Sequence, residues 1–201
     1  MNVNCPYNGG LTAEQSLFYE IRIVSKMYLK GVSVDDAIEA VKADNLFQYP
    51  TERLVSRMTR ACYKRMDALN NDHLRNGIAY APVEIAKQIN LYAMMRYNRL
   101  VYEFLVGVIG EKFRNQDFSF SRKDLNAFFS RLQEQNDYVA EWSDSTLGKI
   151  KQVLTKILVE TGYLDTFKSE KLNQVFLCSE LEEGIRENND PEALAAFNCF
   201  R

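Results

Sequence analysis

The sequence predicts a compact, globular, all-α protein. Hydrophobic residues make up 46% of the chain and charged residues 26%, which is typical of a folded protein rather than a disordered one. Only nine Gly and four Pro interrupt 201 residues, and apolar side chains recur at helical spacing along most of the length. We expect an N-terminal helical region over residues 1–81 and a second region over residues 82–201, packed together as one globule.

Capping residues predict the first two helices. Thr12 and Gln15 have the T-x-x-Q spacing of a capping box, which predicts that a helix begins there, and Gly31 predicts where it ends. Ser33 is the expected N-cap of a second helix. The side chains expected to face inward are Leu17, Ile21, Val24, Tyr28, Ala37, Val41 and Leu46.

A third helix is predicted after the turn at residues 45–50, with Thr51 as its N-cap and an end near Asn70. Its apolar face is Val55, Met58, Cys62, Met66 and Leu69. Its other face carries bases at i, i+4, i+7 and i+11, which we call the basic row: Arg53, Arg57, Arg60 and Lys64, with Arg65 beside it. A short helix, a turn and a longer basic helix form the layout of a helix-turn-helix, whose second helix enters the major groove of DNA. A solvated helix face is the alternative interpretation of the same pattern.

The middle of the chain is predicted to be its most buried part. Residues 70–81 are interpreted as a polar connector, and Pro82 opens a helix that runs to about Phe113 with a candidate break near Tyr97. The longest apolar run, Leu100–Gly110, has eleven residues, one of them a glutamate. This is about half the length that crosses a bilayer, so we interpret the run as a buried helix.

The segment Ser143–Asp165 predicts a helix with two distinct faces. Ser143 is its expected N-cap and Gly162 its expected end, and a helix capped by Ser121 and Asp124 precedes it. The core face is Leu147, Ile150, Leu154, Ile157, Leu158 and Thr161. Another face, the polar column, can donate to phosphates or base edges: Ser145, Lys149, Gln152 and Lys156. These helices are a second helix-turn-helix-like unit.

Two observations bear on whether this second unit binds DNA. Any amphipathic surface helix has an apolar and a polar face, so the polar column fits a solvated surface as well as a DNA-binding one. Gly148 inside the predicted helix costs roughly 1 kcal/mol relative to Ala, which points to close approach of the backbone to DNA or to a packed helix.

The C-terminal part is expected to hold a short wing and two short helices. Residues 174–177 have a β-like pattern that suits a wing. Ser179 and Glu182 predict a capping box for an acidic helix, and Asp190-Pro191 predicts a last turn or two.

Charge is unevenly distributed along the chain. The formal net charge is −2, but residues 170–201 carry seven acids and three bases, which leaves 20 acids and 22 bases over residues 1–169. A local basic stripe can therefore attract phosphate, although the whole molecule gains little from long-range steering.

The sequence holds no motif for catalysis or metal binding. His73 is the only histidine and lies in the predicted connector, where a surface position is expected rather than a catalytic base. There is no P-loop, GxGxxG or GxSxG motif, and the N-terminus lacks the regions of a signal peptide. The cysteines are far apart, without a CxxC pair, which predicts reduced cytosolic thiols: Cys5, Cys62, Cys178 and Cys199. We expect no catalysis, cofactor or metal.

Several short stretches together carry a resemblance to a known family: Gly9-Gly10-Leu11, Tyr28-Leu29 with Gly31, Asn45-Leu46-Phe47-Gln48, the Arg57 and Arg60 pair, Glu111-Lys112-Phe113, Phe128-Phe129 and the Ser143–Asp165 segment. In these stretches the chain resembles the BrxA family, accessory proteins of BREX bacteriophage-exclusion systems. The resemblance covers nearly the whole chain. It implies an all-helical, NusB-like protein with two helix-turn-helix units that binds double-stranded DNA. Relatives often carry Arg where Leu147 stands.

The resulting hypothesis is a non-enzymatic, cytoplasmic, monomeric component of BREX defence that binds double-stranded DNA largely without sequence preference and contacts other BREX proteins. The candidate DNA-binding residues are Arg53, Arg57, Arg60, Lys64, Arg65, Ser143, Ser145, Thr146, Lys149, Gln152 and Lys156. The alternative is a helical adaptor whose basic helices dock acidic proteins of the same system without binding nucleic acid. RNA binding, by analogy with NusB, rests on fold alone.

Overall fold

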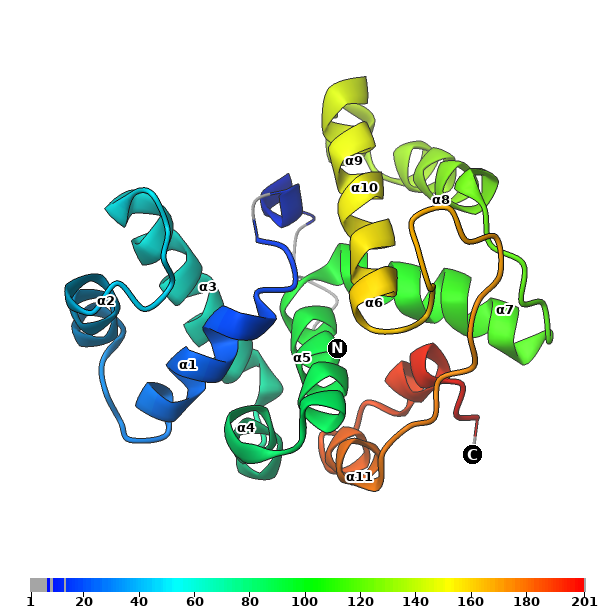
Figure 1. Ribbon diagram of the computed structural model, residues 1–201. Coiled ribbons are helices and arrows are strands. Elements are labelled where there is room, and N and C mark those ends of the chain that lie inside the picture. Colours follow the sequence, from blue (N-terminus) through cyan, green and yellow to red (C-terminus); the bar gives the residue numbers. More distant parts are fainter. Residues whose placement is uncertain (1–6, 8, 13, 201) are drawn as a thin grey trace. The chain divides into compact units, whose positions relative to one another are not determined.

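The computed structural model describes residues 7, 9–12 and 14–200, and within them the chain divides into two compact units (Figure 1). Unit 2 is formed by residues 16–97 and 178–188. Unit 1 contains the described residues up to 15, together with residues 98–177 and 189–200. Each unit combines segments that are far apart in the sequence, and the division falls between Tyr97 and Asn98 rather than between residues 81 and 82.

Unit 2 is a helical bundle. Its helices are α1 (Phe18–Tyr28), α2 (Val34–Ala43), α3 (Glu52–Leu69), α4 (Asp72–Tyr80), α5 (Val83–Tyr97) and α11 (Ser179–Glu187). Helix α3 packs against α1, α2 and α5, and α4 packs against α1, α5 and α11. All five residues of the predicted apolar face of α3 are buried, so this prediction is confirmed.

Unit 1 is also helical. Its elements are η1 (Gly9–Thr12), α6 (Arg99–Phe104), η2 (Leu105–Gly110), α7 (Glu111–Arg114), α8 (Arg122–Gln135), α9 (Asp137–Ala140), α10 (Asp144–Glu160) and η3 (Pro191–Phe197). The run predicted to be a buried helix forms most of α6 and all of η2, a π-helical turn, and most of it is buried. Among the described residues, no helix combines the length and apolarity needed to cross a bilayer.

A close packing contact inside unit 1 depends on a glycine. Elements η2 and η3 pack together, and a Cβ added to Gly110 would lie 3.0 Å from Ala195. Such a distance is tighter than ordinary van der Waals contact, so the absence of a side chain at Gly110 permits the two segments to approach.

The all-α prediction is confirmed, but the predicted wing is not. In the described part of the chain the one β-type pairing is a bridge between Ser119 and Lys171. Residues 174–177 form no strand. The neighbouring backbone of residues 118–120 is already bonded to residues 170–172, through hydrogen bonds of 2.9 Å and 2.7 Å, so it offers residues 174–177 no partner.

Most predicted helix starts are confirmed by their hydrogen bonds. The side chains of Ser33, Thr51 and Ser143 each accept a hydrogen bond from the backbone N–H three residues later. Ser121 and Asp124 form the predicted capping box. These caps are local in sequence, which is why a linear pattern predicts them.

The predicted start of the first helix is wrong. Helix α1 begins at Phe18, and Leu17 before it has the left-handed conformation with φ of 50°, so Thr12 and Gln15 do not cap it. The carbonyl oxygen of Ser16 accepts hydrogen bonds from Arg65 at 2.6 Å and from Asn90 at 2.9 Å. These tertiary bonds hold the carbonyl outside any helix.

Two further predictions are wrong. Residues 70–81 are not a connector, because α4 (Asp72–Tyr80) occupies most of them, with Asn71 accepting from the backbone N–H of Leu74 as its N-cap. Helix α11 has Cys178 as its N-cap, without a capping side chain, so Ser179 and Glu182 form no capping box. The Cys178 N–H instead donates to Gln88 Oε1 at 3.0 Å.

Among the described cysteines, Cys62, Cys178 and Cys199 form no disulfide. Cys5 lies outside the described residues.

Candidate nucleic-acid interface

The basic row lies on the exposed side of α3 in unit 2. Arg53, Arg57, Arg60 and Lys64 are all exposed, opposite the buried apolar face of the same helix. Arg60 is paired through Nη2 with Asp35 Oδ1 at 3.0 Å. Both side chains of this pair are more than half exposed, so water screens the attraction and a phosphate can compete with the carboxylate.

Arg65 does not belong to this exposed row. Its side chain is 1% exposed, and Nη1 donates to the Ser16 carbonyl at 2.6 Å. Its position one residue after Lys64 turns it by about 100° around the helix, toward the buried side. The prediction of Arg65 as a DNA-binding residue is therefore wrong, and its role is to hold the segment before α1.

The first turn of α10, in unit 1, presents a cluster of hydroxyl groups. Ser143 Oγ accepts from the Thr146 N–H at 3.3 Å and lies 3.0 Å from Thr146 Oγ1 and 3.3 Å from Ser145 Oγ. The positive end of a helix dipole lies at this turn, where anions are stabilised. Asp144 beside it carries the opposite sign and weakens that attraction.

The polar column divides into an exposed part and a part held by the protein. Ser145, Lys149 and Gln152 are exposed. Lys156 is half-buried: its Nζ donates to Gln15 Oε1 and lies 3.6 Å from Glu160 Oε1. Ser145, Lys149 and Gln152 are therefore open to a ligand, whereas Lys156 is held by its hydrogen bond to Gln15, before α1.

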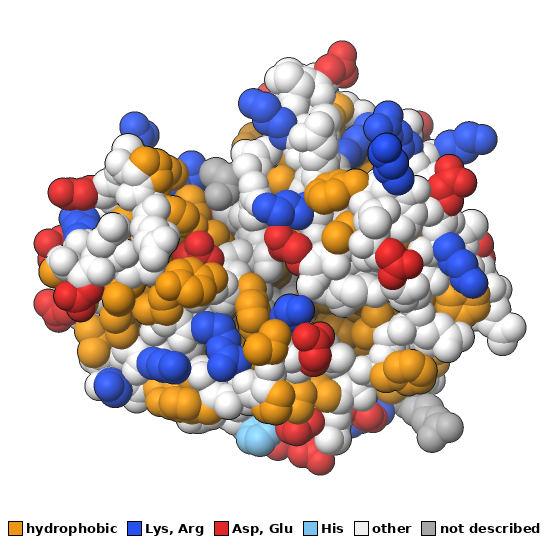
Figure 2. All heavy atoms as spheres, in the orientation of Figure 1, with side chains coloured by type: hydrophobic (Ala, Val, Ile, Leu, Met, Phe, Trp, Pro, Cys, Tyr) orange, Lys and Arg blue, Asp and Glu red, His pale blue; other side chains and the backbone are white. Residues whose placement is uncertain are grey.

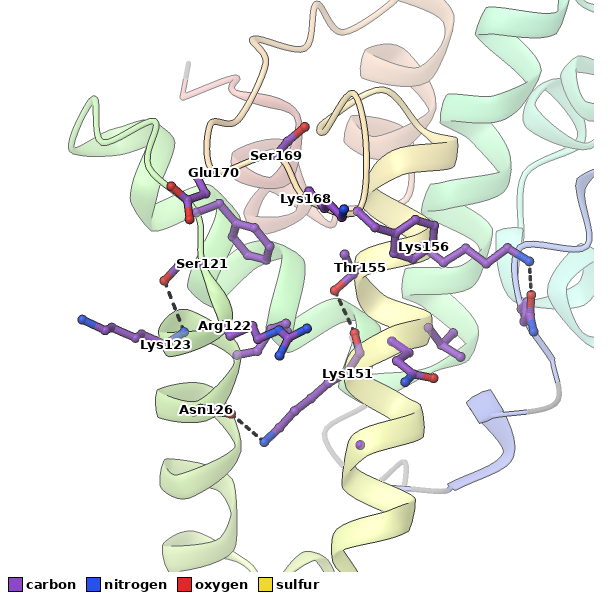
Figure 3. Close-up of a pocket in the computed structure, with 17 residues that line it drawn as sticks. Ser121, Arg122, Lys123, Asn126, Lys151, Thr155, Lys156, Lys168, Ser169 and Glu170 are labelled. Atoms are coloured by element: carbon purple, nitrogen blue, oxygen red, sulfur yellow. Dashed lines mark hydrogen bonds between the residues drawn. The ribbon is translucent and has the colours of Figure 1, made fainter.

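A groove of about 1040 Å³ lies in unit 1 between the start of α8, one face of α10 and residues 167–170 (Figure 3). Five cations and one carboxylate line it: Arg122, Lys123, Lys151, Lys156, Lys168 and Glu170. Figure 2 shows lysine and arginine side chains gathered over the region of α8 and α10. Because cations dominate the walls, the groove attracts anions.

The cations of the groove differ in how firmly they are held. Lys151 Nζ donates to Asn126 Oδ1 on α8 at 2.8 Å, across the groove, and lies 5.4 Å from the centre of the Phe129 ring (Figure 3). Arg122, Lys123 and Lys168 form no ion pair with any of the residues that the structure describes. The groove therefore combines one oriented ammonium group with three cations available to a ligand.

Ion pairs hold α8 at the edge of the groove. Lys112 Nζ lies 2.8 Å from Asp117 and 2.9 Å from Asp124, and Asp124 also accepts from the Ser121 N–H at 2.7 Å. Hydrogen bonds from Lys112 and Ser119 hold the pKa of Asp117 below its ordinary value. Burial opposes the same effect at Asp124, but the bonds from Lys112 and Ser121 outweigh it and its pKa is also lowered.

Gly148 lies on the groove face of α10, three residues before Lys151. A Cβ added there would meet no described atom within 4 Å. The packing of the described chain therefore does not require glycine, although glycine inside a helix costs roughly 1 kcal/mol relative to alanine. Of the two explanations given by the sequence, close approach to a packed helix finds no support.

Sequence reasoning missed most of the groove. Of the predicted site residues, Gln152 and Lys156 line it, whereas Arg122, Lys123, Lys151 and Lys168 were not singled out. The Arg-Lys pair directly after the N-cap Ser121 was a signal for the first two. Nothing in the linear pattern shows that residues 122, 151 and 168 meet.

The described residues contain no group of three or more His, Cys, Asp or Glu side chains placed to hold a metal ion. His73 is exposed on α4, as predicted for a surface residue. The candidate site is built from cations, hydroxyls and amides, which bind anions.

Fold and site define an all-α protein with exposed cationic helix faces and a cation-lined groove. A family model described as BrxA matches residues 5–189, and the chain belongs to the BrxA family.

Proteins named BrxA are similar to this chain over most of its length. A protein named BREX protein BrxA from Bacillus cereus is 32% identical over 185 residues, which is 92% of each chain. A protein of the same name from Paramagnetospirillum magneticum is 25% identical over 85% of each chain. In fold, the chain resembles the crystal structure of an uncharacterized protein from Magnetospirillum magneticum, with a TM-score of 0.81 and 23% identity over 95% of this chain and 97% of that one.

Proposed function

We propose that this chain is a non-enzymatic component of a BREX phage-defence system that acts in the cytoplasm by binding double-stranded DNA. Membership of the BrxA family supports the link to BREX. The main support for DNA binding is the groove in unit 1, which lies along the polar column of α10 and is lined by five cations and only one carboxylate. The exposed basic row of α3 is a second cationic face, in unit 2.

The side chains on these faces favour binding without sequence choice. Helix α10 contains no arginine, and its exposed donors are hydroxyls, an amide and single ammonium groups. Such groups reach phosphates but lack the bidentate Arg-to-guanine geometry that discriminates between bases by about 1 to 3 kcal/mol. Leu147 is 7% exposed and belongs to the core.

The test is duplex binding measured over a salt series by a gel shift. Binding should be clear at low salt and should fade steeply as salt rises, because each phosphate contact releases counterions. Replacing Arg57 and Arg60 together by Gln should weaken binding about equally on unrelated sequences and reduce the slope of log affinity against log salt by up to about two. Absence of duplex binding by the wild-type protein at low salt would refute the proposal.

A helical adaptor remains the second candidate. Tyr80 and Val83, at the corner between α4 and α5, are 63% and 51% exposed, and tyrosine is among the residues enriched at protein–protein interfaces. This function predicts no duplex binding at any salt concentration. It also predicts that Tyr80→Ser with Val83→Ser abolishes binding to a purified BREX partner while leaving the melting temperature unchanged.

A further inference from the structure

We propose that the groove of unit 1 holds the phosphodiester backbone of one strand of duplex DNA, with Gly148 as the point of closest approach. The inference rests on the proposed function and assigns its main phosphate contacts to a surface that includes only Gln152 and Lys156 of the polar column. The groove residues that carry it are Arg122, Lys151 and Lys168, on three separate segments of unit 1.

The cations of the groove are numerous, and most of them are not paired with a carboxylate among the described residues. Arg122, Lys123 and Lys168 have no carboxylate partner among the described residues, so their charge is not already neutralised. Lys151 is oriented by Asn126 and the Phe129 ring, which lowers the entropy cost of placing its ammonium group on a ligand. Charge-assisted hydrogen bonds from such groups to phosphate are among the stronger polar contacts.

The length of the groove suits a short run of phosphates. The groove face of α10 runs from Gly148 to Lys156, which is about 12 Å at the rise of an α-helix. Neighbouring phosphates of one strand are 3.4 Å apart along the duplex axis but further apart along the winding backbone itself, so this length matches roughly two to three phosphates. The groove has enough cations for that number of contacts.

The backbone of α10 is exposed at Gly148. Alanine is a better helix former than glycine, and the space beside Gly148 is open in the described protein. Alanine would therefore stabilise the free protein, so the advantage of glycine here lies in a bound state. A sugar-phosphate chain that passes over α10 at this point would need that space.

The experiment compares three variants of the full chain for binding to one duplex over a salt series. Arg122→Gln removes a groove cation, and Arg131→Gln is its matched control, since it makes the same change on the same helix. Residues 122 and 131 lie about 180° apart on α8, and Arg131 does not line the groove. Gly148→Ala adds one methyl group to the face of α10. Melting temperatures are measured for all three.

Arg122→Gln should reduce the salt slope by roughly 0.9, the loss of one phosphate contact, whereas Arg131→Gln should leave the slope unchanged. Gly148→Ala should raise the melting temperature by about 2 to 4 °C and still weaken duplex binding by roughly tenfold. Loss of affinity in a more stable protein cannot come from misfolding.

Two results overturn the inference while leaving the proposed function standing. One is a wild-type protein that binds duplex normally while Arg122→Gln and Arg131→Gln give equal slopes. The other is a Gly148→Ala variant whose duplex affinity stays within about twofold of the wild type. If the wild-type protein itself fails to bind duplex at low salt, the proposed function and the inference fail together.

Discussion

Arg65 Nη1 donates a 2.6 Å hydrogen bond to the carbonyl oxygen of Ser16, 49 positions earlier in the chain. This bond joins α3 to the segment before α1. Because Arg65 is buried, it does not belong to the exposed cationic face that the sequence predicts for α3. The same carbonyl accepts from Asn90 on α5, so Ser16 is a junction for three parts of unit 2.

Arg65→Gln should therefore destabilise the protein rather than weaken DNA binding directly. Loss of a hydrogen bond from a buried charged group is expected to lower the free energy of unfolding by about 2 to 3 kcal/mol. Arg53→Gln, the same change at an exposed position of α3, should stay within about 0.5 kcal/mol of the wild type. Urea unfolding followed by circular dichroism measures both, and equal stabilities would contradict the buried role of Arg65.

Asp35→Asn should tighten duplex binding. The Asp35 carboxylate pairs with Arg60 at 3.0 Å and competes with phosphate for the same guanidinium. Because exposed pairs contribute at most about 1 kcal/mol, the expected gain is roughly two- to threefold. Glu84→Gln, which removes a carboxylate paired with Lys87 on α5, is the control for net charge. An equal gain in both variants would attribute the effect to net charge alone.

Lys149→Ala should lower affinity by a similar factor on every duplex tested. Lys149 is exposed on α10, and a single ammonium group contacts phosphate without distinguishing bases well. A selection from random duplexes should accordingly return at most a weak sequence motif. A sharp motif that disappears in Lys149→Ala, with general binding preserved, would show that α10 reads bases.

The cluster of Lys112, Asp117 and Asp124 predicts an acid-sensitive contribution to stability. Both carboxylates have a pKa below the ordinary 3.8 in the folded protein. A group with a lowered folded pKa stabilises the protein above its unfolded pKa, and that stability is lost as pH falls through the folded value. The contribution should therefore be complete above about pH 4 and fade below it.

Lys112→Gln tests this cluster. The variant should be less stable than the wild type at pH 7. The difference should shrink as pH falls from about 4 toward 2, because protonation of the carboxylates then removes from the wild type the ion pairs that the variant lacks at every pH. Urea unfolding at pH 7, 4 and 3 measures the difference. A gap that stays constant over this range would mean that Lys112 acts through packing alone.

The all-α class, the limits of α3 and α10, and their buried faces could be predicted from the sequence alone. These features depend on interactions within a few residues: Ser143 caps α10 through the N–H of Thr146, and the apolar residues of α3 repeat at the period of the helix itself. The exposure of the basic row follows from the same period. Local hydrogen bonds and periodic burial can both be predicted from the order of residues along the chain.

The tertiary structure alone decided which polar groups are available to a ligand. The burial of Arg65 depends on a carbonyl 49 positions away, and the start of α1 depends on the same carbonyl. The groove brings together side chains from residues 122, 151 and 168, whose separation in sequence carries no periodic signal. The physical reason is that a charge is exposed or buried according to what packs beside it, and packing partners in this chain come from distant segments.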